Sequence, residues 1–194
     1  MNIQGFSFKN NILAYTASMR WHGALIATMA GWLGIISSGA ELNVAKIILI
    51  LTVLCVGWGV NQVINDYLGL KEDSFNAPSR PMASGALNSR FALIVSAILF
   101  TTGLLISYAL NPETVILYLF VFALNIIYEP LKRIPLVGNI IFGLLIAPCL
   151  YYGATCASQN RLAAILSDAY LARLAILVWL INTALCFISP SCRP

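Results

Sequence analysis

The sequence has very little charge: charged residues make up 9% of its 194 residues, whereas hydrophobic residues make up 60%. A soluble globular domain usually carries about 25% charged residues. The scarcity of charge therefore excludes an ordinary water-soluble domain and indicates a chain surrounded mostly by lipid. The formal net charge of +4 is also small. Lysines and arginines stand in short gaps between apolar stretches and form no basic face, so we expect no nucleic acid partner.

Paired cysteines and a removable leader are also missing. The five cysteines include no CxxC pair, and four of them stand within or beside apolar stretches. We therefore predict that they are small apolar side chains, with no metal or disulfide role. The first 20 residues include Lys9 and Arg20 but no compact apolar core followed by a small-residue cleavage site, so we expect no cleaved signal peptide.

Apolar stretches follow one another along almost the whole chain. A helix needs about 20 apolar residues to cross a bilayer. The fourth stretch is short, so we expect its helix to extend past Tyr128. The sequence therefore predicts an all-α fold, a polytopic transmembrane helical bundle that forms a single domain over residues 1–194. We expect spans near 23–40, 44–65, 91–110, 114–128, 136–157 and 168–188.

Basic residues gather on one side of this six-span arrangement. Only Lys46, Arg161 and Arg173 fall on or near the other side. Because loops rich in lysine and arginine stay on the cytoplasmic side, we predict that the N-terminus and the loops 66–90 and 129–135 face the cytoplasm. The protein is then an integral, multi-pass protein of the cell membrane.

The long loop after the second span holds three of the seven acidic residues of the chain. If the second helix continues for two more turns, Asn65, Gly69 and Asp73 share one face of it, with Asp66 beside that face. Ionisable groups at the edge of a membrane bundle are costly and are functional by default. The spacing therefore favours a group of carboxylates and amides at the mouth of a cavity.

Oxygen ligands of this kind suit magnesium, which typically takes one or two carboxylates together with substrate phosphates. A diphosphate also attracts cations, for which Arg80 and Lys132 are candidates. The composition thus predicts a magnesium-diphosphate site. A solvated loop at the membrane surface, with polar residues at the helix ends, explains the local composition equally well.

Two motifs here resemble those of the UbiA superfamily of intramembrane prenyltransferases. Residues 65–85 are similar to the family's NDxxDxxxD motif followed by INxPxRPxxSG. Residues 128–139 are similar to its YxxxLKRxPxxGN segment, with one residue fewer between the tyrosine and the leucine. The two motifs occur in the family's order, at about its separation and on the same predicted side of the membrane. The agreement favours the site over the solvated loop.

The resemblance implies roles for eight residues. Asn65, Asp66 and Asp73 would bind magnesium and the donor's diphosphate, and Arg80 and Lys132 would neutralise the diphosphate as it leaves, so that Asp66, Asp73 and Lys132 are the candidate catalytic residues. The further candidates for substrate binding are Tyr128, Arg133 and Asn139. A position at the membrane interface explains Tyr128 equally well, and a role in helix packing explains Asn139 equally well.

The family reaction implied by the resemblance is the magnesium-dependent transfer of a prenyl group from an isoprenoid diphosphate to a hydrophobic or aromatic acceptor in the bilayer. A cavity walled by lipid-buried helices would exclude water from the allylic cation. The expected cofactor is Mg²⁺, and the expected partners are the isoprenoid diphosphate, the acceptor and the lipid bilayer.

The chain departs from the family pattern in two places. The middle aspartate of the first motif is Gly69 here, although Asp66 and the pair Glu72 and Asp73 supply other oxygen atoms. Family members typically have nine spans and a second aspartate motif after the sixth, whereas no acidic residue follows Asp168. We therefore expect a chain that is incomplete at its C-terminus. A non-catalytic remnant or assembly protein and a small transporter subunit remain alternatives.

Overall fold

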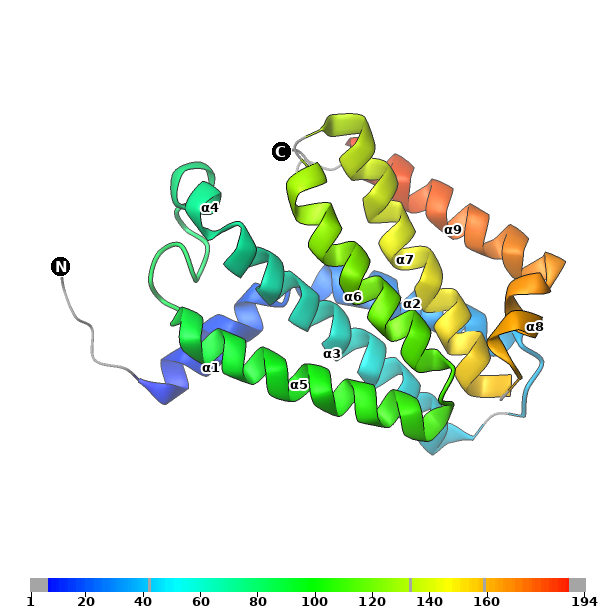
Figure 1. The fold of residues 1–194 in the computed structure, drawn as a ribbon. Helices are drawn as coiled ribbons and strands as arrows, with labels where there is room; N and C mark the ends of the chain where they lie inside the picture. Colours follow the sequence, from blue (N-terminus) through cyan, green and yellow to red (C-terminus); the bar gives the residue numbers. More distant parts are fainter. Residues whose placement is uncertain (1–6, 42, 133, 159, 189–194) are drawn as a thin grey trace.

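The computed structural model describes residues 7–41, 43–132, 134–158 and 160–188, and these residues form helices and no strand (Figure 1). The prediction of an all-α fold is therefore confirmed. The helices are α1 (Phe8–Ser18), α2 (Trp21–Ser37), α3 (Val44–Leu68), α4 (Leu70–Asn76), α5 (Ser89–Leu110), α6 (Thr114–Leu131), α7 (Pro135–Ser158), α8 (Leu162–Ser167) and α9 (Ala169–Ile188).

Four of these helices, α3, α5, α6 and α7, are long and apolar enough to cross a membrane, and α2 and α9 are shorter apolar helices. The structure is the multi-pass membrane bundle that the sequence predicts. Each of the six expected ranges falls on one of these helices, and the fourth extends past Tyr128 to Leu131. That all six cross the bilayer stays a prediction.

Short polar side chains begin three of the helices. Asn43, Asn88 and Asp168 precede α3, α5 and α9, and each side-chain oxygen accepts a hydrogen bond from a backbone N–H group of the first helical turn. Such caps satisfy donors that have no partner inside the helix. The cap residues therefore explain where the apolar helices begin.

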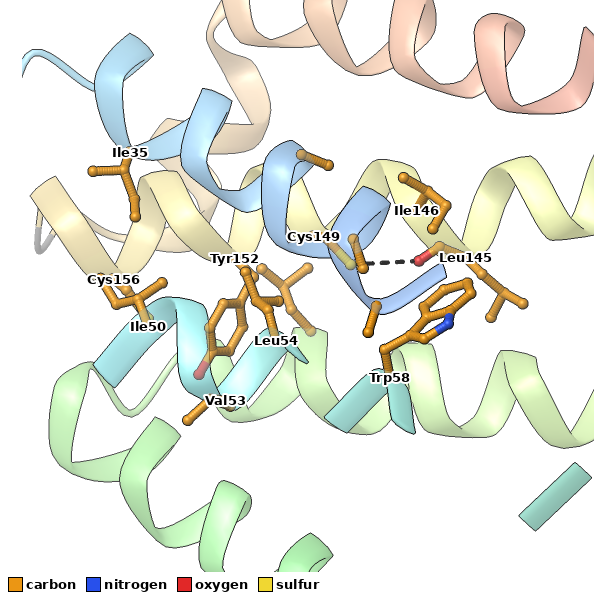
Figure 2. Packing of buried hydrophobic residues seen from close by; sticks show 14 of the residues in the cluster. Ile35, Ile50, Val53, Leu54, Trp58, Leu145, Ile146, Cys149, Tyr152 and Cys156 are labelled. Atoms are coloured by element: carbon orange, nitrogen blue, oxygen red, sulfur yellow. Dashed lines mark hydrogen bonds between the residues drawn. The ribbon is translucent and has the colours of Figure 1, made fainter. Parts of the chain in front are cut away.

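The main apolar core lies where α7 packs against α2, α3 and α6. In Figure 2, Ile50 of α3 lies beside Cys156 of α7, and Trp58 of α3 lies toward Leu145 and Cys149 of α7. All five side chains are buried, and the thiol of Cys149 donates to the backbone carbonyl of Leu145, one turn earlier in α7. This cysteine is thus an apolar packing residue, as the sequence predicts.

Glycines bring α2 and α7 into backbone contact. A Cβ atom added to Gly153 would lie 2.8 Å from the carbonyl carbon of Gly31 and closer still to its oxygen. A Cβ atom added to Gly34 would lie 2.8 Å from the carbonyl carbon of Leu150. Small residues at such crossings allow helices to approach closely in lipid, where packing and not hydrophobicity drives association.

Replacing a glycine at this crossing is expected to loosen the bundle. The Gly153→Ala substitution places a methyl group against the rigid backbone of α2, so we expect it to destabilise the fold by about 1–3 kcal/mol and to lower the thermal unfolding midpoint of the detergent-solubilised protein. Gly57→Ala is the matched control, because its Cβ atom would meet only the ring of Tyr118, at an ordinary 3.4 Å. Equal midpoints for the two variants would contradict the close crossing.

Candidate functional site

The junction of α3 with α4 and the end of α6 lie at the same end of the bundle (Figure 1). A polar cavity lies between them. It encloses about 1040 Å³ of space, including open solvent at its mouth. Its lining combines amide, carboxylate and basic side chains with a few apolar ones. The lining residues are Arg20, Gln62, Asn65, Asp66, Glu72, Asp73, Asn76, Ala77, Arg80, Tyr128, Glu129, Lys132, Phe142 and Leu145.

The helical register of α3 continues across Gly69 into α4. The N–H group of Gly69 donates to the carbonyl of Asn65 at 2.8 Å, and the N–H group of Asp73 donates to the carbonyl of Gly69 at 2.9 Å. Because both bonds join residues four apart, Asn65, Gly69 and Asp73 follow one another on one face, as the spacing predicts. The junction thus carries Asp73 to the same cavity as Asp66.

Two arginines neutralise the two aspartates. Asp66 is only 2% exposed, and its Oδ1 atom lies 2.5 Å from a guanidinium nitrogen of Arg20. Arg80 lies 2.5 Å from Oδ1 of Asp73, and the same Arg80 nitrogen is 3.7 Å from Oδ1 of Asp66. The guanidinium of Arg80 therefore bridges the two carboxylates.

Arg80 keeps its charge in this setting. Burial lowers the pKa of its guanidinium, but the hydrogen bond and negative charge of Asp73, together with the charges of Asp66 and Glu129, outweigh burial and raise the pKa above its ordinary value. A permanently charged, planar donor at the mouth of the cavity suits a phosphate group.

The end of α6 adds a third ion pair and a helix-to-helix amide pair. Lys132 lies 2.5 Å from Oε1 of Glu129. Asn125 donates to the side-chain oxygen of Asn65 at 3.0 Å and accepts from its amide at 2.9 Å. The paired amides join α3 to α6, and the side-chain oxygen of Asn65 keeps one lone pair for a further partner.

Arg20 has an unusual backbone conformation. Among the described residues it is the only one other than glycine with a positive φ, which is 50°. The left-handed region costs an ordinary residue about 1–2 kcal/mol. Such strain persists where surrounding structure fixes it, and it occurs often at functional sites. The turn between α1 and α2 thus aims the Arg20 side chain at Asp66.

Most of the candidate residues from the sequence meet in this cavity. Six of them line it, whereas Asn139 lies half-buried on α7 and is not part of the lining, and Arg133 lies outside the described residues. The six lining candidates are Asn65, Asp66, Asp73, Arg80, Tyr128 and Lys132.

Sequence reasoning missed two charged residues of the cavity, Arg20 and Glu129. Arg20 stands near the N-terminus, outside both motifs, so neither motif gave a reason to select it. Glu129 stands at a variable position of the YxxxLKRxPxxGN segment, so the motif gave no reason to select it. The signal that could have drawn attention to Glu129 is its spacing of three from Lys132, which favours an ion pair on a helix.

The donor set of the cavity fits magnesium, provided that phosphate oxygens complete it. Carboxylate oxygens are the hard ligands that Mg²⁺ prefers, and each ion pair of Asp66 and Asp73 uses only Oδ1. Within the described ranges, however, no three His, Cys, Asp or Glu side chains are already grouped to hold a metal. The residues therefore fit an ion that arrives with a diphosphate.

An apolar cavity of about 460 Å³, a volume that includes open solvent at its mouth, lies further along α3, between α5, α6 and α7. Asn61 lines this cavity, and Gln62 and Asn65 line the polar one, so the two follow each other along α3. The remaining lining is apolar or aromatic: Val53, Leu54, Gly57, Trp58, Phe100, Leu117, Tyr118, Val121, Phe122, Pro148, Cys149 and Tyr152.

Comparison with known proteins identifies the family. The profile of the UbiA prenyltransferase family matches residues 24–190, which is most of the chain. The chain belongs to the UbiA prenyltransferase family. It is 30% identical over 173 residues to a digeranylgeranylglyceryl phosphate synthase of Thermococcus kodakarensis and 31% identical over 169 residues to that of Pyrococcus abyssi.

The UbiA fold is also found in solved structures. A structure reported for digeranylgeranylglyceryl phosphate synthase in membranes superposes with a TM-score of 0.73 at 26% identity, over 89% of this chain and 60% of that one. A UbiA homolog from Aeropyrum pernix K1 has a TM-score of 0.69 at 21% identity, over 82% of this chain and 61% of that one. The alignments to the two synthases cover 88% and 86% of this chain but only 60% and 59% of theirs.

The buried charge of Asp66 is expected to depend on Arg20. Breaking a buried ion pair by removing one partner costs about 3–5 kcal/mol. Because Arg80 also lies near Asp66, we expect Arg20→Gln to cost about 3 kcal/mol at most and to lower the unfolding midpoint. Adding Asp66→Asn removes the unpaired charge and should recover most of the loss. A double variant no more stable than Arg20→Gln would contradict the pairing.

Proposed function

We propose that this chain transfers a prenyl group from an isoprenoid diphosphate to a lipid-like acceptor in the membrane. The observation that supports this function is the arrangement of three basic side chains, each paired with a carboxylate, around one cavity that adjoins an apolar cavity. The polar cavity suits the diphosphate, and the apolar one suits the prenyl chain. Residues 1–194 act as one membrane domain in this proposal.

The basic side chains bind the donor. Arg20, Arg80 and Lys132 are all paired with carboxylates, and Arg80 bridges two of them. When a diphosphate enters, these cations turn from the carboxylates toward the phosphate oxygens, which accept charge-assisted hydrogen bonds. The exchange keeps every buried charge paired, as a site of low dielectric constant requires.

The acidic side chains hold the cofactor. Asp66 and Asp73, released by the arginines, would bind Mg²⁺ together with the phosphate oxygens, and the second lone pair of Asn65 would be available to the same ion. A bound magnesium ion stabilises the negative charge that develops on the leaving diphosphate.

Transfer breaks the bond between the first prenyl carbon and the diphosphate oxygen, and the electron pair leaves with the diphosphate. The acceptor oxygen forms the new bond to that carbon and gives its proton to the leaving diphosphate. Tyr128 lines the polar cavity, and its ring lies 6.0 Å from that of Phe142. Its π-face can stabilise the allylic cation, while the apolar walls exclude water.

The acceptor is proposed from the relatives. Their name describes a product in which geranylgeranyl groups are joined to glyceryl phosphate. Geranylgeranyl diphosphate is therefore the donor to test, with geranylgeranylglyceryl phosphate as the acceptor. We also propose, from the distribution of lysine and arginine, that the polar cavity faces the cytoplasm. Arg133 and Asn139 remain proposed contributors to substrate binding.

Removing the two aspartates is expected to abolish transfer. Membranes containing the full chain are supplied with radiolabelled geranylgeranyl diphosphate, geranylgeranylglyceryl phosphate and Mg²⁺. Product formation should fall at least about 100-fold in the Asp66→Asn, Asp73→Asn variant, because electrostatic stabilisation of the leaving group is lost. Chelation of Mg²⁺ should have the same effect on the unmodified chain.

Glu41→Gln is the matched control, because Glu41 is exposed in the connection between α2 and α3, at the other end of the bundle. Its rate should equal that of the unmodified chain. An aromatic acceptor in a parallel reaction separates the two acceptor classes. No product from the unmodified chain with either acceptor would contradict the proposed function and favour a non-catalytic role.

A further inference from the structure

The polar cavity contains a carboxylate from α6 in addition to those from α3 and α4. The face formed by Asn65, Gly69 and Asp73 carries no side chain at its middle position. A Cβ atom added to Gly69 would lie 2.5 Å from Oε1 of Glu129 and 3.5 Å from the carboxyl carbon of Glu129. The carboxylate of Glu129 therefore occupies the place where the side chain of residue 69 would begin.

The surroundings of Glu129 are those of a site residue. It lies in the last turn of α6, is only 8% exposed and lines the same cavity as Asp66 and Asp73. Its charge acts on Arg80 and its Oε1 atom lies 2.5 Å from Lys132. A carboxylate at this depth is costly unless it has a positive partner, and Asp66, Asp73 and Glu129 each have one.

We propose that Glu129 supplies from α6 the carboxylate that the Asn65–Gly69–Asp73 face lacks, and that it acts with Asp66 and Asp73 in binding the divalent cation of the donor. The inference rests on the proposed function, because the cation arrives with the diphosphate. When Glu129 turns to the cation, Lys132 becomes available to a phosphate oxygen.

The proposal explains why residue 69 is glycine. Any larger side chain would enter the space of the Glu129 carboxylate, and an acidic one would also add like charge to it. The two positions are therefore alternatives: a carboxylate can enter this part of the cavity from α6 or from the α3–α4 junction. This mutual exclusion can be tested by moving the charge from one position to the other.

The test measures Mn²⁺ binding by electron paramagnetic resonance, with inorganic pyrophosphate and the full chain in lipid nanodiscs. Glu129→Gln keeps the size of the side chain but removes its charge, and we expect it to weaken Mn²⁺ binding at least about tenfold. Gly69→Asp alone should also weaken binding, because two carboxylates then compete for one space. Combining Gly69→Asp with Glu129→Ala relocates the carboxylate and should recover most of the affinity.

Controls separate this inference from the proposed function. Glu41→Gln should bind as the unmodified chain does, and Asp66→Asn should not bind. If Glu129→Gln binds Mn²⁺ normally while Asp66→Asn does not, Glu129 has no part in holding the cation and the proposed function stands. If the unmodified chain itself binds no Mn²⁺ with pyrophosphate, both proposals are wrong. If Glu129 only holds Lys132, relocation of the charge will restore nothing.

A failure of the relocated variant to fold is detected by its thermal unfolding midpoint. The inference is then decided by Glu129→Gln against Glu41→Gln, since both replace a carboxylate by an amide of the same shape. A tenfold difference between these two supports the proposal, and equal Mn²⁺ affinities contradict it.

Discussion

The pairing of opposite charges at one end of a lipid-buried bundle is the constraint on which the rest of this structure depends. A carboxylate that is nearly enclosed by protein is stable only with a positive partner. Asp66, Asp73 and Glu129 each have one, and the partners come from the α1–α2 turn, the loop after α4 and the end of α6. The pairs therefore fix how these segments meet.

The packing of the helices holds the segments that carry the ion pairs in place. The glycine crossing of α2 and α7 and the apolar core around α7 hold the helices in register. The amide pair between Asn65 and Asn125 joins α3 to α6 directly beside the cavity. On this support, the polar cavity and the apolar one follow each other along α3. An isoprenoid diphosphate matches this arrangement, because its diphosphate is polar and its hydrocarbon tail is apolar.

The sequence predicted those features of the fold and of the site that depend on a single physical signal. Runs of apolar residues located the apolar helices α2, α3, α5, α6, α7 and α9, because length and hydropathy alone decide what suits a bilayer. The short helices α1, α4 and α8 carry no such signal and were not predicted as separate helices. The spacing of Asp66 and Asp73 and the motif that contains Lys132 predicted that these residues share a site, and the cavity brings them together.

The sequence could not predict which side chains pair with one another in the cavity. Arg20 lies 46 residues from Asp66 in the chain, and only the turn between α1 and α2 brings them together. The approach of Glu129 to Gly69 depends on where α6 ends relative to the α3–α4 junction. Asn65 was predicted as a metal ligand from its motif, and its pairing with Asn125 depends on the packing of α3 against α6. Such contacts are properties of tertiary packing.

The central claim, that the cations of the cavity exchange their carboxylates for a diphosphate, is tested most directly by an experimental structure. The full chain would be determined with Mg²⁺ and a thiolodiphosphate analogue of geranylgeranyl diphosphate, which resists cleavage. The account predicts the diphosphate among Arg20, Arg80 and Lys132, with Asp66 and Asp73 turned toward the metal and the prenyl chain in the apolar cavity. A diphosphate bound elsewhere, with all three ion pairs intact, would contradict it.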